Sequence, residues 1–204
     1  MHVSVFSFLK ISDDAIAEHL IVTETLRHDC KVLEQIACHM IKALLNGKKV
    51  VWCGNGGSAA DSQHLAAELV GRFRRERRGL ASLALSTNTS VLTAISNDYG
   101  YEYVFRRQIE ALCLEGDVVV GISTSGNSSN VCLALEAARE RGCIAVAFTG
   151  QDGGRAARIA DVAFLVQSTK TSRVQETHIL CGHIICDWIE LSICQMHCVE
   201  DADA

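Results

Sequence analysis

The sequence of 204 residues contains no proline, and only 5% of its residues are aromatic. The residue that most strongly interrupts helices is therefore missing, and uninterrupted helices are possible throughout the chain. The formal net charge of −5 gives no overall bias toward nucleic acid or membrane surfaces. With 49% apolar and 21% charged residues, the composition is that of a globular protein rather than a disordered one.

Targeting and membrane signals are also missing. The N-terminus lacks the charged start and the long apolar segment of a signal peptide. No apolar run approaches the length that spans a membrane. We therefore expect a cytoplasmic protein that has neither a membrane nor nucleic acid as its partner.

The ten cysteines form no CxxC pair and no zinc-finger spacing. Several lie inside apolar runs, which indicates small buried residues in a reducing compartment; these are Cys53, Cys143, Cys181 and Cys186. Cys194 and Cys198 are four residues apart and could form a metal or redox pair, but we interpret them as ordinary apolar positions.

Apolar runs alternate with helical patterns along most of the chain. The expected strands are 49–53, 82–85, 117–122, 143–149 and 162–166, and the expected helices among them are 58–74, 90–95, 101–114, 130–141, 153–159 and 173–196. This alternation predicts an α/β fold with a mostly parallel sheet. Such sheets bind ligands at the carboxyl ends of their strands.

Two helical patterns precede the first strand. The first starts at Ser12-Asp13-Asp14, and the second runs from Leu33 to Leu44 and stops at Asn46-Gly47. They cannot complete a sheet unit, so we expect them to pack on the later core or on another subunit. Residues 1–204 are predicted to form a single domain, with 1–48 as an N-terminal helical segment that contributes to oligomerisation.

The stretch from Val50 to Leu69 joins a strand, a Gly-rich turn and a helix. The turn, Asn55-Gly56-Gly57, lets the backbone approach a ligand, and the free N–H groups of the helix start suit an anion. Ser58 is expected to cap this helix. His64 and Glu68 are four residues apart and therefore share one helix face. Each feature alone is common in ordinary turns and solvated helices, but together they indicate a site.

A second polar loop, Ser123-Thr124-Ser125-Gly126-Asn127-Ser128, follows a strand and opens a helix. Its hydroxyls and backbone N–H groups can surround a phosphate. The alternative is a loop with redundant helix caps, but the hydroxyls outnumber what capping requires. The basic run Arg72–Arg78 is interpreted mainly as a solvated helix end and loop, although one of its arginines could hold an anionic substrate.

The closing helix carries Gln175, His178 and His183. Gln175 and His183 lie within about a quarter-turn of one helix face, whereas His178 points toward a different side. If they meet His64 and Glu68, two His, one Glu and one Gln would suit zinc or a similar divalent ion. Because Gln is an unusual metal ligand, the residues alone support this site weakly.

Five motifs in residues 29–190 together resemble the phosphoheptose isomerases of the sugar isomerase (SIS) domain family: CGNGGSAADSQHLAAEL, LTAISNDYGYEYVF, GISTSGNSSNV, AFTGQDGG and RVQETHILCGHIICD. This resemblance implies a three-layer α/β/α sandwich of the SIS type with a mostly parallel sheet, preceded by N-terminal helices. It also implies a cytoplasmic homotetramer with its sites at subunit interfaces.

The resemblance also implies the roles of individual residues. Glu68 is expected to be the catalytic base and His183 its acid–base partner. One zinc ion per subunit is expected on His64, Glu68, Gln175 and His183. Contacts with the sugar phosphate are expected at Asn55, Gly56, Gly57, Glu68, Asn97, Asp98, Ser123, Thr124, Ser125, Ser128 and Gln175.

The implied reaction converts D-sedoheptulose 7-phosphate into both anomers of D-glycero-D-manno-heptose 7-phosphate, the first step of heptose supply for lipopolysaccharide and related glycans. A carboxylate bound to zinc is a poorer base, so the sequence leaves open whether the metal is catalytic or structural. Two alternatives share the fold: a non-catalytic SIS protein that binds the replication initiator, and a sugar-phosphate-sensing module. The presence of Glu68, Ser125 and His183 together favours the enzyme.

Overall fold

The computed structural model describes residues 7–200, with side chains described as far as residue 196. Its five strands form one sheet in the order β2-β1-β3-β4-β5, with every neighbouring pair parallel. The strands are β1 (Val50–Gly54), β2 (Ser82–Ala84), β3 (Val118–Ser123), β4 (Ile144–Gly150) and β5 (Val162–Val166). All residues of β1 and β3 are buried, as expected for strands covered on both faces. The predicted parallel sheet is confirmed.

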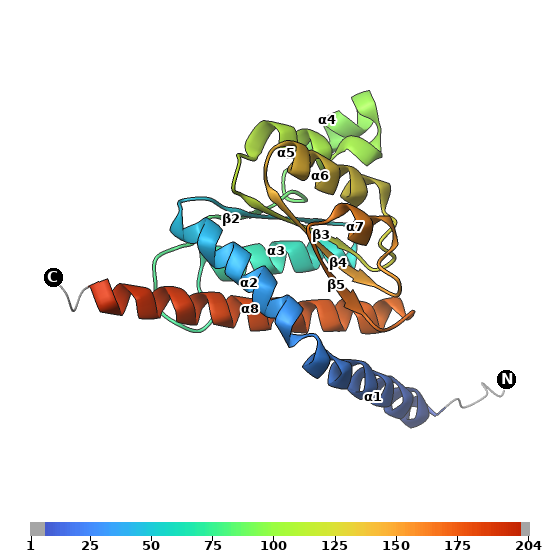
Figure 1. Cartoon of the computed structure of the whole chain (residues 1–204). Helices are drawn as coiled ribbons and strands as arrows, with labels where there is room; N and C mark the ends of the chain where they lie inside the picture. Colours follow the sequence, from blue (N-terminus) through green and yellow to red (C-terminus); the bar gives the residue numbers. More distant parts are fainter. Residues whose placement is uncertain (1–6, 201–204) are drawn as a thin grey trace.

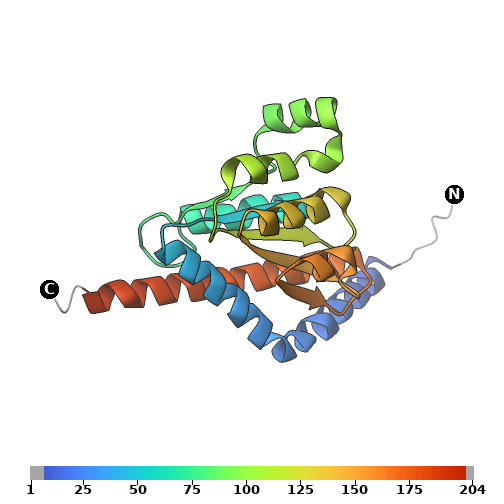
Figure 2. The same ribbon diagram turned by 45° about the horizontal axis from the view of Figure 1, so that its top comes forward.

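Helices cover both faces of the sheet (Figures 1 and 2). One apolar core lies between the sheet and α2 (Cys30–Leu45), α3 (Gly57–Val70) and α8 (Thr171–Glu200). The other lies between the sheet and α5 (Arg106–Leu112), α6 (Ser129–Glu140) and α7 (Gly154–Ile159). Side chains alternate between the cores along a strand, so Trp52 enters the first core and Cys53 the second. The three-layer sandwich is therefore confirmed.

The N-terminal helix α1 (Phe8–Thr25) projects from the sandwich, as Figures 1 and 2 show from two directions. It joins α2 through the short helix η1 (Leu26–His28). It begins before the predicted Ser12, because the N–H groups of Lys10 and Ile11 bond to the carbonyl of Ser7. Val22 is its one buried residue, so most of its apolar side chains face outward.

Two predicted helices differ in their bounds. The helix after β1 ends at Val70 and not near Arg74, because backbone N–H groups of the following loop bond to a carboxylate on α8. Ser58 does not cap this helix: Gly56, at φ +55°, occupies the N-cap position. The predicted helix 101–114 is divided into η2 (Tyr101–Tyr103) and α5, and it follows α4 (Thr89–Tyr99).

Helix α8 is the longest in the described chain. By length and composition alone, its segment Thr171–Met196 is long and apolar enough to cross a membrane. The expectation that no apolar run approaches membrane-spanning length is therefore wrong for this helix. It contacts α2 and α3, and its buried Glu190 and partly buried Asp187 form ion pairs with arginines of the 71–79 loop. These contacts are those of a core helix in the sandwich.

The cysteines follow the sequence interpretation where the structure describes them. Cys53, Cys143, Cys181 and Cys186 are buried, and the nine cysteines with described side chains are free. Burial raises the pKa of the Cys53, Cys181 and Cys186 thiols to about 12, which leaves them protonated and unreactive at neutral pH. The side chain of Cys198 lies outside the described residues, so its relation to Cys194 stays a prediction.

Candidate active site

The strand order reverses direction between β1 and β3, the point where doubly wound sheets bind ligands. The two polar loops found in the sequence follow these two strands. The Asn55 side chain, after β1, exchanges two hydrogen bonds of 2.8 Å with the Asn130 side chain at the start of α6. The Tyr101 hydroxyl donates a third bond, of 3.2 Å, to Asn55 Oδ1. The two loops are thus tied together at one end of the sheet.

The loop after β3 keeps its hydroxyls away from the helix backbone. Ser128 is the N-cap residue of α6, yet its side chain makes no capping bond and lies 2.9 Å from the Ser123 hydroxyl. Ser125 is exposed, and its Oγ accepts the N–H of Asn127 at 3.2 Å. The Thr124 carbonyl accepts the N–H of Gly150 at 3.1 Å, which fixes the loop to β4. Hydroxyls and a helix start are therefore available to an anion.

Helices α3 and α8 run side by side in the same direction and approach each other closely at two glycines. A Cβ atom on Gly57 would lie 2.6 Å from Gln175 Nε2, and one on Gly182 would lie 2.5 Å from a Leu65 methyl group. At Gly182 the buried Leu65 side chain leaves no room for a Cβ atom, whereas at Gly57 the end of the Gln175 side chain would have to move. The second contact brings His183, the neighbour of Gly182, opposite α3.

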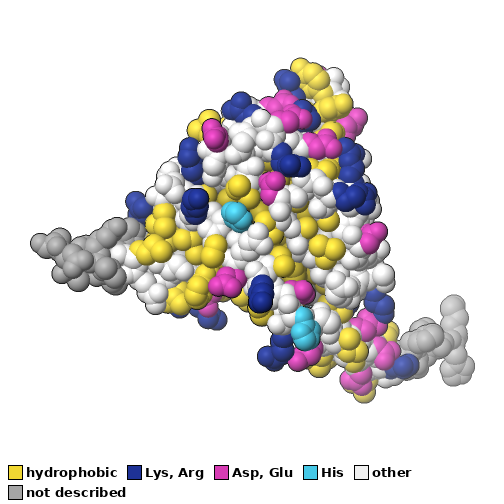
Figure 3. All heavy atoms as spheres, viewed as in Figure 1, with side chains coloured by type: hydrophobic (Ala, Val, Ile, Leu, Met, Phe, Trp, Pro, Cys, Tyr) yellow, Lys and Arg dark blue, Asp and Glu magenta, His cyan; other side chains and the backbone are white. Residues whose placement is uncertain are grey.

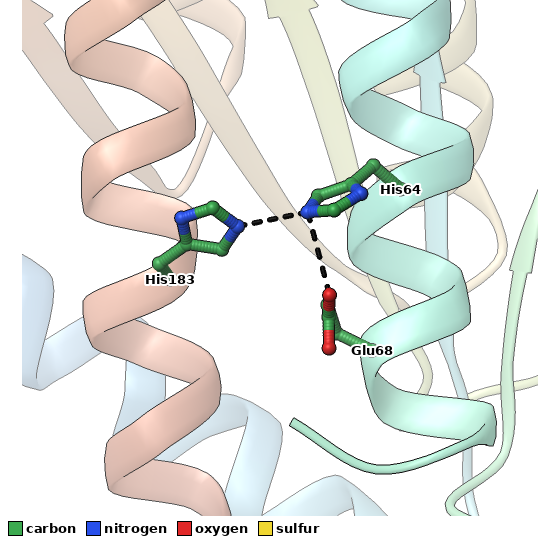
Figure 4. Close-up of side chains that lie close together, drawn as sticks. All are labelled: His64, Glu68 and His183. Atoms are coloured by element: carbon green, nitrogen blue, oxygen red, sulfur yellow. Dashed lines mark hydrogen bonds and ion pairs between the residues drawn. The ribbon is translucent and has the colours of Figure 1, made fainter. Parts of the chain in front are cut away.

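His64, Glu68 and His183 converge in the space between these helices (Figure 4). His64 Nε2 lies 2.8 Å from His183 Nε2 and 3.4 Å from Glu68 Oε1, and one ligand atom from each residue lies within 4.8 Å of the others. A tetrahedral zinc ion with bonds of about 2.1 Å separates its ligand atoms by roughly 3.4 Å. The donor set therefore fits a divalent ion. Gln175 lies two turns earlier on α8, beside Gly57.

The charges around this cluster act on His183 and Asp61. Burial, together with the charge of His64, lowers the pKa of His183, while Glu68 raises it. Asp61, one turn before His64, has a buried Oδ2 without a hydrogen-bond partner among the described residues. Burial raises the pKa of its carboxyl group, and His64 opposes this shift. Sequence reasoning missed Asp61, although it lies within the motif that contains His64.

A second group of potential metal ligands, Cys113, Asp117 and Cys143, lies buried at the opposite end of β3 and β4. Asp117 already accepts the backbone N–H of Lys49 at 3.0 Å, its ammonium group at 2.5 Å, and the N–H of Leu114 at 2.8 Å. A metal ion would compete with this ammonium for the same carboxylate. The group is therefore better explained as a structural junction than as a metal site.

Other predicted site residues lie apart from these contacts. Asn97 and Asp98 are on the exposed helix α4, where the Asn97 side chain donates to Asp98 Oδ1 at 2.8 Å. Among residues 7–196, no hydrogen bond connects either of them to the loops after β1 and β3. The basic run is not simply solvated: the Arg77 side chain is only 3% exposed and pairs with Glu190. Its burial follows from a carboxylate more than a hundred residues away, which the local pattern cannot indicate.

Comparison with known proteins identifies the family. The SIS domain model matches residues 17–150. The chain is 54% identical to the phosphoheptose isomerase of Nitratiruptor sp. over 169 residues, covering 79% of this chain and 90% of that protein. It is 56% identical to that of Aquifex aeolicus over 153 residues, covering 75% and 80% respectively. The solved phosphoheptose isomerase of Neisseria gonorrhoeae matches with a TM-score of 0.86 and 44% identity, covering 90% of this chain and 99% of that one.

Proposed function

We propose that this chain, a member of the SIS domain family and of its phosphoheptose isomerases, converts D-sedoheptulose 7-phosphate into D-glycero-D-manno-heptose 7-phosphate. The chain is thus an aldose–ketose isomerase. This reaction would be the first step in the synthesis of ADP-heptose or GDP-heptose for lipopolysaccharide or related glycans. The observation that carries the proposed chemistry is the convergence of Glu68 with His64 and His183 between α3 and α8.

The phosphate is assigned to the loop between β3 and α6. The exposed Ser125 hydroxyl and the N–H groups at the start of α6 can donate to its oxygens, and the helix dipole favours its charge. Ser123, Thr124 and Ser128 complete this loop. The turn after β1, with Asn55, Gly56 and Gly57, is assigned to the sugar hydroxyls, together with Asn97, Asp98 and Gln175.

The isomerisation moves a proton from C1 to C2 and transfers the carbonyl group from C2 to C1. Glu68 is assigned as the base that takes the C1 proton to form an enediol and returns a proton at C2. His183 is assigned as the acid–base group that moves a proton between the two oxygens. Its pKa, lowered by burial, favours the neutral imidazole, which can donate from one nitrogen and accept at the other.

Zinc is the proposed metal, one ion per subunit. His64, Glu68 and His183 would hold it, with Gln175 as the fourth ligand suggested by the family resemblance. When bound, the ion would supply Lewis-acid polarisation of the substrate oxygens. Glu68 and His183 are thereby assigned both to holding the ion and to proton transfer.

The proposed assembly is a homotetramer of single SIS domains, residues 1–204, with the sites at subunit interfaces. A groove of about 740 Å³ lies between the α1–α2 segment and α8, lined by apolar side chains that include Leu33, Ile184 and Trp188. Ile184 and Trp188 are almost half exposed in one subunit. Figure 3 shows hydrophobic side chains at the surface over α1 and over the C-terminal part of α8. A second copy of the chain would cover these surfaces.

A cytoplasmic location is proposed from the free cysteines. The nine that are described carry no disulfide, which suits a reducing compartment. The alternative functions, binding of the replication initiator or sugar-phosphate sensing, need neither the carboxylate of Glu68 nor the imidazole of His183. The meeting of these two side chains therefore favours the isomerase.

A coupled assay for heptose 7-phosphate tests the proposal, combined with deuterium incorporation from solvent at C1 and C2. Glu68→Gln keeps the side-chain shape and should lose about 10²–10⁴-fold in kcat together with the exchange. Glu115→Gln, an exposed carboxylate at the other end of β3, is the matched control and should keep full activity. A folded Glu68→Gln variant with wild-type turnover would remove Glu68 as the base. A wild type that binds the ketose but never isomerises it would leave the binding functions.

A further inference from the structure

One buried carboxylate holds the loop that follows α3. Glu190 Oε1 accepts the backbone N–H of Phe73 at 2.6 Å, and Oε2 accepts those of Arg74 at 2.8 Å and Arg75 at 2.9 Å. Glu190 is fully buried. Burial alone would raise its pKa, but the three N–H groups and the Arg77 charge lower it below its ordinary value. The carboxylate therefore stays ionised, and the backbone of the loop is fixed to α8.

Arg77 connects the same carboxylate to the end of α3. Its Nη2 lies 2.9 Å from Glu190 Oε1 and donates to the carbonyl of Glu68 at 2.8 Å. Its Nη1 donates to the carbonyl of Leu69 at 2.8 Å. A guanidinium at a helix C-terminus satisfies carbonyls that lack helical partners and favours the helix dipole. The loop therefore joins the two helices that carry Glu68 and His183.

The phenyl ring of Phe73 stacks on the imidazole of His183, with ring centroids 5.3 Å apart and an angle of 20° between the planes. The edge of the His64 ring contacts the same imidazole, with centroids 5.1 Å apart. The χ2 torsion of histidine is broad, so an unsupported ring could turn its Nε2 away from His64. The stack leaves the imidazole in the orientation in which Nε2 faces His64 at 2.8 Å.

Packing in the core does not explain this arrangement of Phe73. The phenylalanines of the two main cores, Phe105, Phe148 and Phe164, are at most 1% exposed, whereas Phe73 is only partly buried at the edge of its cluster. The ring is partly exposed, yet its backbone is fixed. The N–H groups of three successive residues, Phe73 to Arg75, all bond to the carboxylate of Glu190. Glu190 and His183 are seven residues apart on α8, so the support and the supported ring lie on the same helix face.

We propose that Phe73 is a positioning residue of the isomerase: fixed by Glu190, its ring holds the His183 imidazole in the orientation that directs Nε2 into the space shared with Glu68 and His64. The inference rests on the proposed function, because it requires His183 to act in the reaction. Phe73 itself touches no reacting atom and acts through His183.

Steady-state kinetics of Phe73→Leu and Phe73→Tyr test this role. Phe73→Leu removes the ring face and should lower kcat about tenfold with KM changed less than about twofold, since the loss falls on orientation and not on phosphate binding. Phe73→Tyr keeps the ring face and should retain wild-type kcat. Leu80→Ala removes buried apolar volume directly after this loop and leaves the ring contacts of His183 with His64 and Phe73 in place, so it should lower the melting temperature but leave kcat unchanged.

Three outcomes would overturn the inference: unchanged kcat in Phe73→Leu, no rescue by tyrosine, or an equal kcat loss in Leu80→Ala. If Phe73→Leu does not fold, Phe73→Met replaces it in the same comparison. Crystal structures of wild type and the leucine or methionine variant provide a test independent of activity, in which the His183 ring should turn or become disordered only in the variant. An inactive wild type would defeat the proposed function, while an unchanged His183 ring in the variant would defeat the positioning role.

Discussion

Acid is expected to weaken this fold through His178. The imidazole is buried on α8, against the contacting rings of Phe148 and Phe164, with centroids 5.7 and 6.2 Å away. Its Nε2 lies 3.0 Å from the carbonyl oxygen of Thr149, and its Nδ1 has no hydrogen-bond partner among the described residues. Burial lowers the pKa of His178 from 6.5 to about 4, although the Thr149 carbonyl acts in the opposite direction.

The sign and size of the effect follow from proton linkage. Between pH 6.5 and pH 4 the unfolded chain binds a proton at His178 that the folded chain does not bind. The free energy of unfolding therefore falls as the pH falls through this window, and the contribution is constant above it. Between pH 7 and pH 5, His178 alone should lower the free energy of unfolding by about 2 kcal/mol.

Urea unfolding at pH 7 and pH 5, at one fixed protein concentration, measures this loss. His178→Gln is the reference, because it has no titrating group and keeps an amide donor for Thr149. The other ionisable groups are common to both proteins, so the difference between their pH dependences isolates His178. The wild type should lose about 2 kcal/mol more than the variant. Equal losses in the two proteins would show that His178 is not held neutral by burial.

Three further changes test the ligand sites and the assembly. Ser125→Ala should raise KM at least about tenfold, because a hydrogen bond to a charged group contributes about 1.5–3 kcal/mol; an unchanged KM would remove this loop from the site. His64→Ala should lower the zinc content measured by elemental analysis, whereas His39→Ala on α2 should not, and equal contents would exclude His64 as a necessary ligand. Deletion of residues 1–28 should shift the light-scattering mass below that of a tetramer, and a monomeric wild type would refute the interfacial-site proposal.

Features encoded in neighbouring residues could be predicted from the sequence. Strand β5 has the predicted bounds because its apolar run is flanked by polar residues at both ends. The hydroxyl-rich loop is predictable because a strand, the hydroxyls and a helix start follow each other directly. The shared face of His64 and Glu68 is predictable because a four-residue spacing fixes a helix face.

Features that depend on distant partners could not be predicted. The local helical pattern predicts that α3 continues to Arg74. The helix ends earlier because the N–H groups near Arg74 bond to the carboxylate of Glu190, more than a hundred residues later. The stack of Phe73 on His183 has the same origin. Burial of Arg77 likewise needs a partner that no local charge pattern reveals.

Helix α8 constrains the number of residues between its functional side chains, in addition to their identity. Gln175, His178, His183 and Glu190 lie on one continuous helix, each directed to a different neighbour. Each residue advances the helix by about 100°, so one inserted residue between Gln175 and His183 would rotate the second away from α3 while both remained present. A substitution, in contrast, leaves this phase intact. Insertions and deletions, and not substitutions on the outer face, are therefore the changes that this helix tolerates least.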